Sequence, residues 1–97
     1  MTPIKWSAQA IADLKSLQRY IANDNPAAAR QVADHILEMI ETVLRPNPEI
    51  GRAGRVPGTR EYVVPDSEYI VPYRLERGQI DIIRVYHGAR RWTELLH

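Results

Sequence analysis

Basic residues and one histidine carry most of the chemistry that this sequence offers. Five of the eleven arginines form two groups, Arg52, Arg55 and Arg60 in an acid-free stretch, and Arg90 with Arg91 near the C-terminus. Guanidinium groups bind phosphates and carboxylates through planar, multidentate contacts. His87 stands just before Gly88, where strand pairing is expected to stop, and an imidazole there can give or take a proton near neutral pH. These types indicate an acidic partner or acid–base chemistry, with a solvated surface and a capping histidine as the simpler alternatives.

Aromatic residues add a second set of candidates. Trp92 directly follows the second arginine group, and it is either a core residue or a contact anchor for a partner. The tyrosines have the ring type that stacks on nucleobases, but tyrosines in strands more often pack in the core. His35 falls inside a predicted helix and is expected at its surface, and His97 is the last residue.

Several classes of protein are excluded by composition. The chain has no cysteine, which removes disulfides, thiolate zinc sites and a cysteine nucleophile. It has no histidine–carboxylate spacing typical of a metal site and no glycine-rich nucleotide loop, so no metal or cofactor is expected. No apolar run reaches the roughly 20 residues of a membrane span, and no signal peptide is recognisable. We therefore expect a cytoplasmic protein, with a net charge of only +1.

Two helices are predicted in the first half of the chain. A short strand is expected near residues 2–6, before a helix that Ser7 caps and that ends near residue 23. Its apolar residues recur at three- and four-residue spacing. Asn25 followed by a proline is typical of the start of a second helix, expected to continue to about residue 45. The very short link predicts an antiparallel helical hairpin.

Three strands are predicted in the second half. They are expected at residues 59–64, 69–75 and 79–87, after a glycine-rich loop at 51–58. Together with the helices they predict one domain over residues 1–97, an α+β fold of order β-α-α-β-β-β. In this fold the N-terminal strand joins a mostly antiparallel twisted sheet, and the helical hairpin packs on one side of it.

The last two strands are expected to pair around the turn Arg77–Gly78. The predicted pairs are Leu75–Ile80, Tyr73–Ile82, Val71–Arg84 and Tyr69–Tyr86 on one face, and Arg74–Asp81 and Ile70–Val85 on the other. Pro72 is difficult to place because proline cannot donate a hydrogen bond to a neighbouring strand. This register therefore needs a four-residue loop that turns the proline nitrogen away from the partner strand, or else a bulge.

One longer sequence motif indicates a protein family, which composition and spacing alone do not. The stretch Gly51–Val64, GRAGRVPGTREYVV, resembles the G-R-x-G-R-V-x-G-T-R-E signature of the ParE-like branch of the RelE/ParE toxins. Further matches are Tyr69–Arg74 and Ile82–Arg90, which resemble the family's last two strands and tail, and the runs at Trp6–Ser7, Tyr20–Ala22 and Asn25–Ala29. The resemblance extends over nearly the whole chain in order.

The resemblance implies the toxin of a type II toxin–antitoxin pair, neutralised by a small antitoxin protein. RelE-like members of the superfamily cut messenger RNA on the ribosome, with basic and acid–base side chains on the sheet. ParE-like members bind DNA gyrase and trap its cleaved DNA without catalysis of their own. The family fold is the helical hairpin on a twisted sheet that the pattern of elements predicts.

This sequence departs from the RelE-like pattern. RelE-like enzymes carry lysines or arginines on the second strand and an arginine early in the third, where this chain has Tyr62–Val64 and Tyr69. The resemblance therefore implies a gyrase inhibitor without catalytic residues. The target contacts expected are Arg52, Arg55, Arg60, Arg90, Arg91 and Trp92. The alternative is a ribosome-dependent endoribonuclease that acts through Arg60, Arg84, His87 and Arg90, and a protein that only co-represses with its antitoxin is a third possibility.

Overall fold

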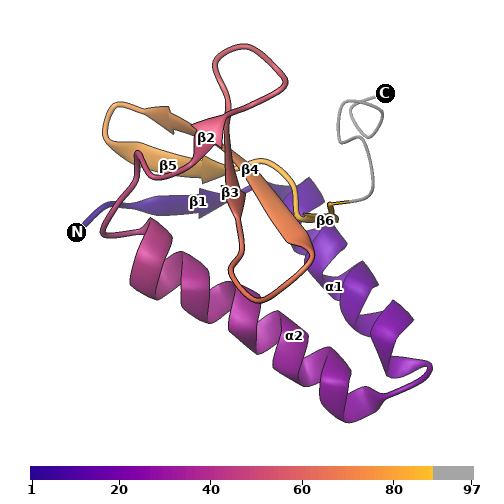
Figure 1. The fold of residues 1–97 in the computed structure, drawn as a ribbon. Helices are drawn as coiled ribbons and strands as arrows, with labels where there is room; N and C mark the ends of the chain where they lie inside the picture. Colours follow the sequence, from indigo (N-terminus) through magenta and orange to yellow (C-terminus); the bar gives the residue numbers. More distant parts are fainter. Residues whose placement is uncertain (89–97) are drawn as a thin grey trace.

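The computed structural model describes residues 1–88 and has two layers (Figure 1). One layer is a hairpin of two helices, α1 (Ala8–Ala22) and α2 (Pro26–Met39), and the other is a six-stranded sheet. The helices cover one face of the sheet. This arrangement confirms the predicted α+β fold and its helical hairpin.

Both helices begin at the residues that the sequence predicts. The Ser7 hydroxyl accepts a hydrogen bond from the backbone of Ala10 at 2.9 Å, and Asn25 Oδ1 accepts one from Ala28 at 3.0 Å. These side chains satisfy backbone N–H groups that have no partner inside the helix. After α2 the chain continues as one π-helical segment, η1 (Ile40–Leu44), so helical structure reaches the predicted end near residue 45.

The sheet has the strand order β1-β5-β4-β3-β2. Its strands are β1 (Ile4–Trp6), β2 (Arg52–Ala53), β3 (Arg60–Val63), β4 (Tyr69–Glu76), β5 (Gln79–Ile82) and β6 (Tyr86–His87). Among the strand pairings within residues 1–88, only that of β1 with β5 is parallel. The short strand β2 lies inside the segment predicted as a loop, and β6 pairs with the first residues of β4.

The predicted register of the last hairpin is right near the turn and wrong beyond it. Leu75–Ile80, Tyr73–Ile82 and Arg74–Asp81 pair as expected around a two-residue turn. The pairs predicted for Val71, Ile70 and Tyr69 do not form, because Ile70 pairs with Tyr86 and Tyr69 with His87. The strand predicted at 79–87 is therefore two strands, β5 and β6, offset by one residue.

Pro72 explains the break. Its carbonyl accepts a hydrogen bond from the backbone of Ile83 at 2.9 Å, but its nitrogen has no hydrogen to return the second bond of that pair. Residues 83–85 leave the ladder at this point, and one extra residue enters before β6 begins. The structure thus takes the bulge, and not the four-residue loop, as its solution to the proline.

The core lies between the helices and one face of the sheet. Alternate residues of the strands point into it, among them Tyr62 of β3, Tyr73 of β4 and Ile80 of β5. From the helical layer it receives Ala10, Leu17, Ile36, Ile40 and Leu44. The residues between them on each strand, such as Glu61 and Pro72, therefore face away from the helices. No helix within residues 1–88 is long and apolar enough to cross a membrane.

Candidate functional site

One buried carboxylate, that of Glu61, binds two of the three arginines in the segment 52–60. Glu61 is 2% exposed. Its Oε1 accepts hydrogen bonds from Arg52 Nε at 3.2 Å and Nη2 at 3.0 Å, and its Oε2 accepts one from the backbone of Arg55 at 3.3 Å. The side-chain Nε of Arg55 lies 4.0 Å from the same oxygen. Glu61 therefore balances two arginines and fixes the shape of their loop.

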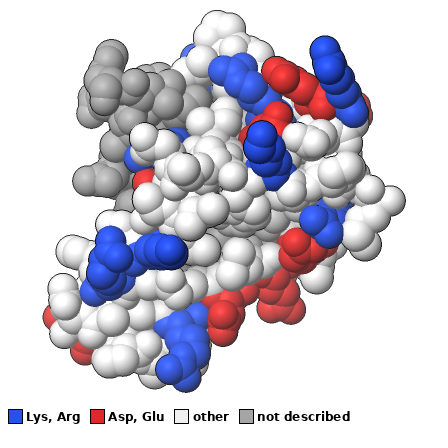
Figure 2. Space-filling model, turned by 180° about the vertical axis from the view of Figure 1, so that it is seen from behind, with Lys and Arg blue, Asp and Glu red and all other residues white. Residues whose placement is uncertain are grey.

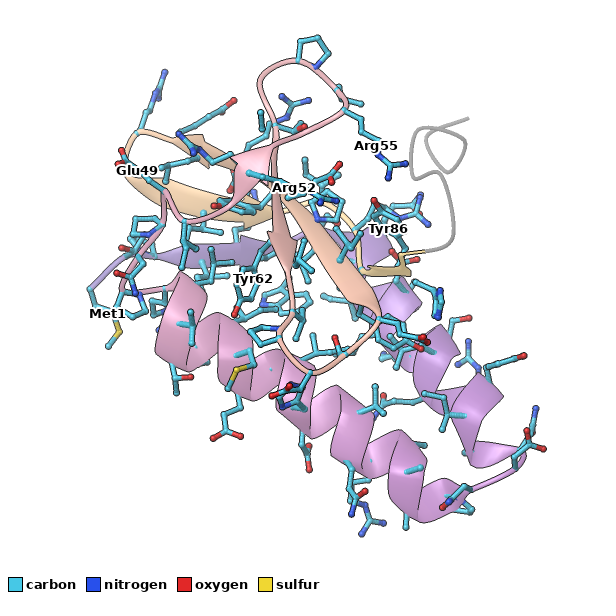
Figure 3. All side chains as sticks on the ribbon, viewed as in Figure 1. Met1, Glu49, Arg52, Arg55, Tyr62 and Tyr86 are labelled. Atoms are coloured by element: carbon cyan, nitrogen blue, oxygen red, sulfur yellow. The ribbon has the colours of Figure 1, made fainter. Side chains whose placement is uncertain are left out.

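This cluster lies on the sheet face that the helices leave uncovered. Glu61 pairs with Pro72, and Tyr86 packs with Ile70 on the same face. Figure 3 labels Arg52, Arg55 and Tyr86. Arg52 and Arg55 nevertheless keep 55% and 43% of their side chains exposed. Burial raises the pKa of Tyr86, Glu61 raises it further, and the two arginines oppose the shift. The Tyr86 phenol is therefore a hydrogen-bond donor at neutral pH.

Arg60, the first residue of β3, is held differently from Arg52 and Arg55. It pairs with Tyr73, so its side chain starts on the helical face of the sheet. Its Nη1 donates to the carbonyls of Glu49 at 3.1 Å and Gly51 at 3.2 Å. Arg60 thereby ties the chain that leaves the helical layer to strand β3.

Arg84 lies in the bulge between β5 and β6 and faces α1. Its Nε donates to Asp13 Oδ2 at 2.7 Å and its Nη2 to Oδ1 at 2.9 Å. The same carboxylate accepts a hydrogen bond from the backbone of Val85 at 3.0 Å. The hydrogen bond with Asp13 raises the pKa of Arg84. This paired guanidinium therefore anchors the bulge to the helix.

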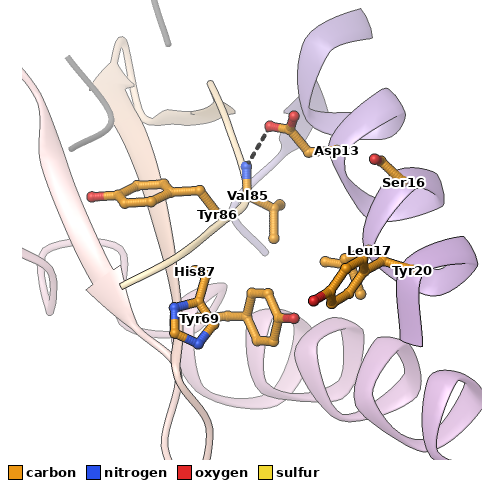
Figure 4. A pocket seen from close by; sticks show the side chains of 8 residues that line it. All are labelled: Asp13, Ser16, Leu17, Tyr20, Tyr69, Val85, Tyr86 and His87. Atoms are coloured by element: carbon orange, nitrogen blue, oxygen red, sulfur yellow. Dashed lines mark hydrogen bonds between the residues drawn. The ribbon is translucent and has the colours of Figure 1, made fainter. Parts of the chain in front are cut away.

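His87 borders a groove between α1 and the sheet. The groove has a volume of about 540 Å³, and Tyr20 of α1 and Tyr69 of β4 also line it (Figure 4). His87 Nε2 lies 2.7 Å from Glu68 Oε2, and its ring meets the Tyr69 ring edge-on with centroids 5.7 Å apart. His35 is partly buried, with Nε2 2.5 Å from the carbonyl of Pro65.

The predicted site residues do not come together at one place. Arg52 and Arg55 share Glu61 on the uncovered face, whereas Arg60, Arg84 and His87 engage three different segments on the helical side. Arg90, Arg91 and Trp92 lie outside the described residues. On the face seen in Figure 2, lysines and arginines are spread over several separate places.

A family model described as the ParE toxin of the type II toxin–antitoxin system parDE matches residues 4–92. The chain belongs to this family. Y4kP of Sinorhizobium fredii is 37% identical over 93 residues, which cover 96% of this chain and 95% of that protein. Toxin RelE2 of Caulobacter vibrioides is 31% identical over 90 residues, covering 93% and 99%.

The fold of this ParE-family toxin agrees with that assignment. A structure from the chromosomal ParDE toxin–antitoxin system of P. aeruginosa superposes with a TM-score of 0.78 and 28% identity, covering 90% of this toxin and 96% of that chain. The resemblance that the sequence signature indicated is confirmed at the level of the superfamily and of its fold.

Two acidic residues of the toxin were not predicted from the sequence. Asp13 organises the bulge and Glu61 the arginine loop. A signal for Asp13 exists, because it stands three residues after buried Ala10 and four before buried Leu17, on the inward side of α1. An acid at such a position needs a partner across the core boundary. Glu61 has the weaker signal of alternation with inward-facing Tyr62 on β3.

Proposed function

We propose that this toxin is neutralised by a small antitoxin protein and acts on DNA gyrase, whose cleaved DNA complex it traps. The family that the chain belongs to is the toxin of parDE systems, and one solved relative comes from a ParDE system. The resemblance of the sequence to the ParE-like branch of the superfamily implies gyrase as the target. Gyrase inhibition of this kind needs binding surfaces and no catalytic residue.

The observation that carries the choice of target is the engagement of the candidate nuclease residues. RNA cleavage needs cations positioned around the scissile phosphate. Arg84 is committed to Asp13 at 2.7 Å, and Arg60 donates to two backbone carbonyls. His87 has the carboxylate of Glu68 beside it. These contacts indicate that the residues stabilise the fold at separate places. This favours a protein that acts by binding over a nuclease.

The proposed target contacts are Arg52, Arg55, Arg60, Arg90, Arg91 and Trp92. Arg52 and Arg55 keep about half of their side chains exposed although both contact Glu61, so each offers donors to a partner. Arg60 contributes through the shape of the loop, because its Nη1 is bonded to the carbonyls of Glu49 and Gly51. Arg and Trp are the residue types most often found as interface anchors.

An antitoxin partner has a direct test. Co-expression of this chain with the product of a small adjacent gene should restore growth, and the two proteins should co-purify. We expect an interface of more than about 1,500 Å² in total. Expression of the chain alone without harm, and without a small protein that binds it, would argue against the toxin function.

The target is tested by induction in cells with two parallel readouts. The proposal predicts a DNA-damage response without codon-specific messenger RNA cleavage. Arg90→Ala/Arg91→Ala and, separately, Trp92→Ala should abolish growth inhibition. Arg30→Ala, which removes an exposed arginine of α2, is the control for the loss of an arginine elsewhere on the surface and should stay toxic. A fully toxic tail double variant would remove the tail from the proposed contacts.

The second candidate function is ribosome-dependent RNA cleavage. One observation favours it, namely that a relative 31% identical to this chain is called Toxin RelE2. Toeprinting of a translated message distinguishes the two functions. Cuts at fixed codon positions that disappear in His87→Ala would replace gyrase inhibition with the nuclease.

A further inference from the structure

The sheet face opposite the helices contains a buried hydrogen-bond donor, the hydroxyl of Tyr86, with no acceptor among residues 1–88. Tyr86 is 3% exposed, and its hydroxyl has no hydrogen-bond partner within residues 1–88. Tyr86 is one of the residues that line the groove beside α1, but its ring points away from the other lining side chains (Figure 4). Tyr86 forms a cluster with Ile70 against which Val56, the residue after Arg55, packs. The charges of Glu61, Arg55 and Arg52 all influence the pKa of Tyr86. An unsatisfied phenol beside two guanidinium groups is costly unless a ligand oxygen can complete it.

The charges at this place favour an anion. Among residues 1–88, Arg52 and Arg55 contribute two positive charges to this cluster and Glu61 one negative charge, which leaves one positive charge in excess. The three donors come from different elements, Arg52 from β2, Arg55 from the loop after it and Tyr86 from β6. Donors that arrive from several directions suit a phosphate, whose oxygens are arranged tetrahedrally, better than a planar carboxylate.

We infer that Arg52, Arg55 and Tyr86 form a binding site for one phosphodiester group of a nucleic-acid backbone, with Glu61 as the positioning residue. The inference deepens the proposed function, because the two arginines are among the proposed target contacts. It rests on that function only for the source of the phosphate, the DNA that gyrase holds. A phosphodiester carries a single negative charge, which matches the excess charge of the cluster.

Of the two arginines, Arg55 has the side chain that Glu61 holds less closely. Its guanidinium lies 4.0 Å from Glu61, while Arg52 is bonded at 3.0 Å. The loop stays in place when this side chain turns, because Glu61 also holds the backbone N–H of Arg55. Because the Tyr86 hydroxyl is buried, binding at this site requires that a covering group moves aside before a phosphate oxygen reaches it. The Arg55 guanidinium would then bind the same phosphate.

The experiment titrates the full-length purified toxin with inorganic phosphate and follows the side-chain Nε–Hε signals of its arginines by NMR. We expect saturable shifts of the Arg52 and Arg55 signals, and chloride at equal ionic strength should not reproduce them. A labelled oligothymidylate and its uncharged methylphosphonate analogue then test the source, with only the charged strand expected to bind. Saturation by an acidic peptide but not by the charged strand would overturn the assignment to nucleic acid.

Two phenylalanine variants make the test independent of folding. Tyr86→Phe removes a hydroxyl that has no hydrogen bond to lose, and it should weaken binding of the charged strand about tenfold. Tyr62→Phe is the matched control, because its hydroxyl is equally buried and unpartnered but lies on the helical side of the sheet. It should bind as the wild type does. Arg55→Gln should weaken binding by at least as much as Tyr86→Phe.

Absence of saturable shifts, or equal affinity in wild type and Tyr86→Phe, would overturn the inference. The proposed function fails by a different result. Phosphate binding without trapped gyrase leaves the site standing and removes the gyrase target, whereas trapped gyrase that Arg55→Gln and Tyr86→Phe leave unchanged removes the site alone.

Discussion

Asp13 and Arg84, which lie 71 residues apart in the sequence, form the contact that joins α1 to the break between β5 and β6. The carboxylate accepts two hydrogen bonds from the guanidinium and a third from the backbone of Val85. It thereby satisfies a backbone N–H that Pro72 has displaced from the sheet. The bulge, the helix and the last strand depend on one acidic side chain.

We predict that Asp13→Asn lowers the free energy of unfolding by about 2 kcal/mol, since hydrogen bonds to charged groups are worth roughly 1.5–3 kcal/mol each and one acceptor remains. Both side chains of the pair are largely buried, at 17% and 12% exposure, so solvent screens the interaction little. Urea denaturation measures the loss. Asp34→Asn, on the exposed side of α2, is the control and should change stability by less than about 0.5 kcal/mol.

Two tyrosine hydroxyls in the core are expected to contribute differently to the free energy of unfolding. The Tyr73 hydroxyl donates to the Pro48 carbonyl at 2.7 Å and accepts from the Gly51 backbone at 2.9 Å. Tyr73→Phe should therefore cost about 2–3 kcal/mol, because two buried polar groups lose their partner. The hydroxyl of Tyr62 has no partner, so Tyr62→Phe should be neutral or slightly stabilising. Equal losses in the two variants, measured by thermal unfolding, would contradict these contacts.

Gly54 is predicted to tolerate no side chain. A Cβ at this position would lie 2.1 Å from Thr59 Oγ1 and 2.9 Å from the Thr59 carbonyl oxygen. Gly54 also donates its N–H to that carbonyl at 2.8 Å, so the two backbones cannot separate without loss of the bond. Gly54→Ala should destabilise the toxin by about 1–3 kcal/mol.

A second glycine gives the control for this clash. Gly78→Asn places a side chain where no atom lies within 4 Å, at a positive φ that asparagine accepts. Its unfolding midpoint in urea should stay near that of the wild type. A Gly54→Ala variant as stable as Gly78→Asn would show that the loop is looser than described.

Alkaline pH should unfold the toxin through its tyrosines. Burial raises the pKa of Tyr62, Tyr69, Tyr73 and Tyr86 above the ordinary value of 10.0. The folded chain then holds these protons at a pH where the unfolded chain has released them. The stabilisation is complete below about pH 10 and is lost as the pH rises through the folded-state values. Urea midpoints between about pH 8 and pH 11.5 should be level at first and then fall, and midpoints that rise with pH would refute this account.

The local part of the fold was predictable because its causes lie within a few residues. Ser7 and Asn25 cap the helices that follow them, and Arg77 and Gly78 adopt the positive φ values of a tight turn. The bulge and strand β2 depend on contacts between distant residues. Pro72 indicates in the sequence that the register needs an adjustment, but the contact of Asp13 with the backbone of Val85, which holds the bulge, joins residues 72 positions apart. Glu61 likewise binds Arg52 and Arg55 across a fold that spacing alone does not show.

The central proposal, that this ParE-family toxin traps cleaved DNA on gyrase, is tested most directly with purified components. The toxin, gyrase and supercoiled plasmid are incubated together. The proteins are then denatured and digested with a protease, and the fraction of linear DNA is measured. The proposal predicts that linear DNA accumulates with wild-type toxin and with Arg30→Ala, and stays at background with Arg90→Ala/Arg91→Ala. Linear DNA at background with the wild-type toxin, together with codon-specific cuts in a ribosome toeprint, would contradict it.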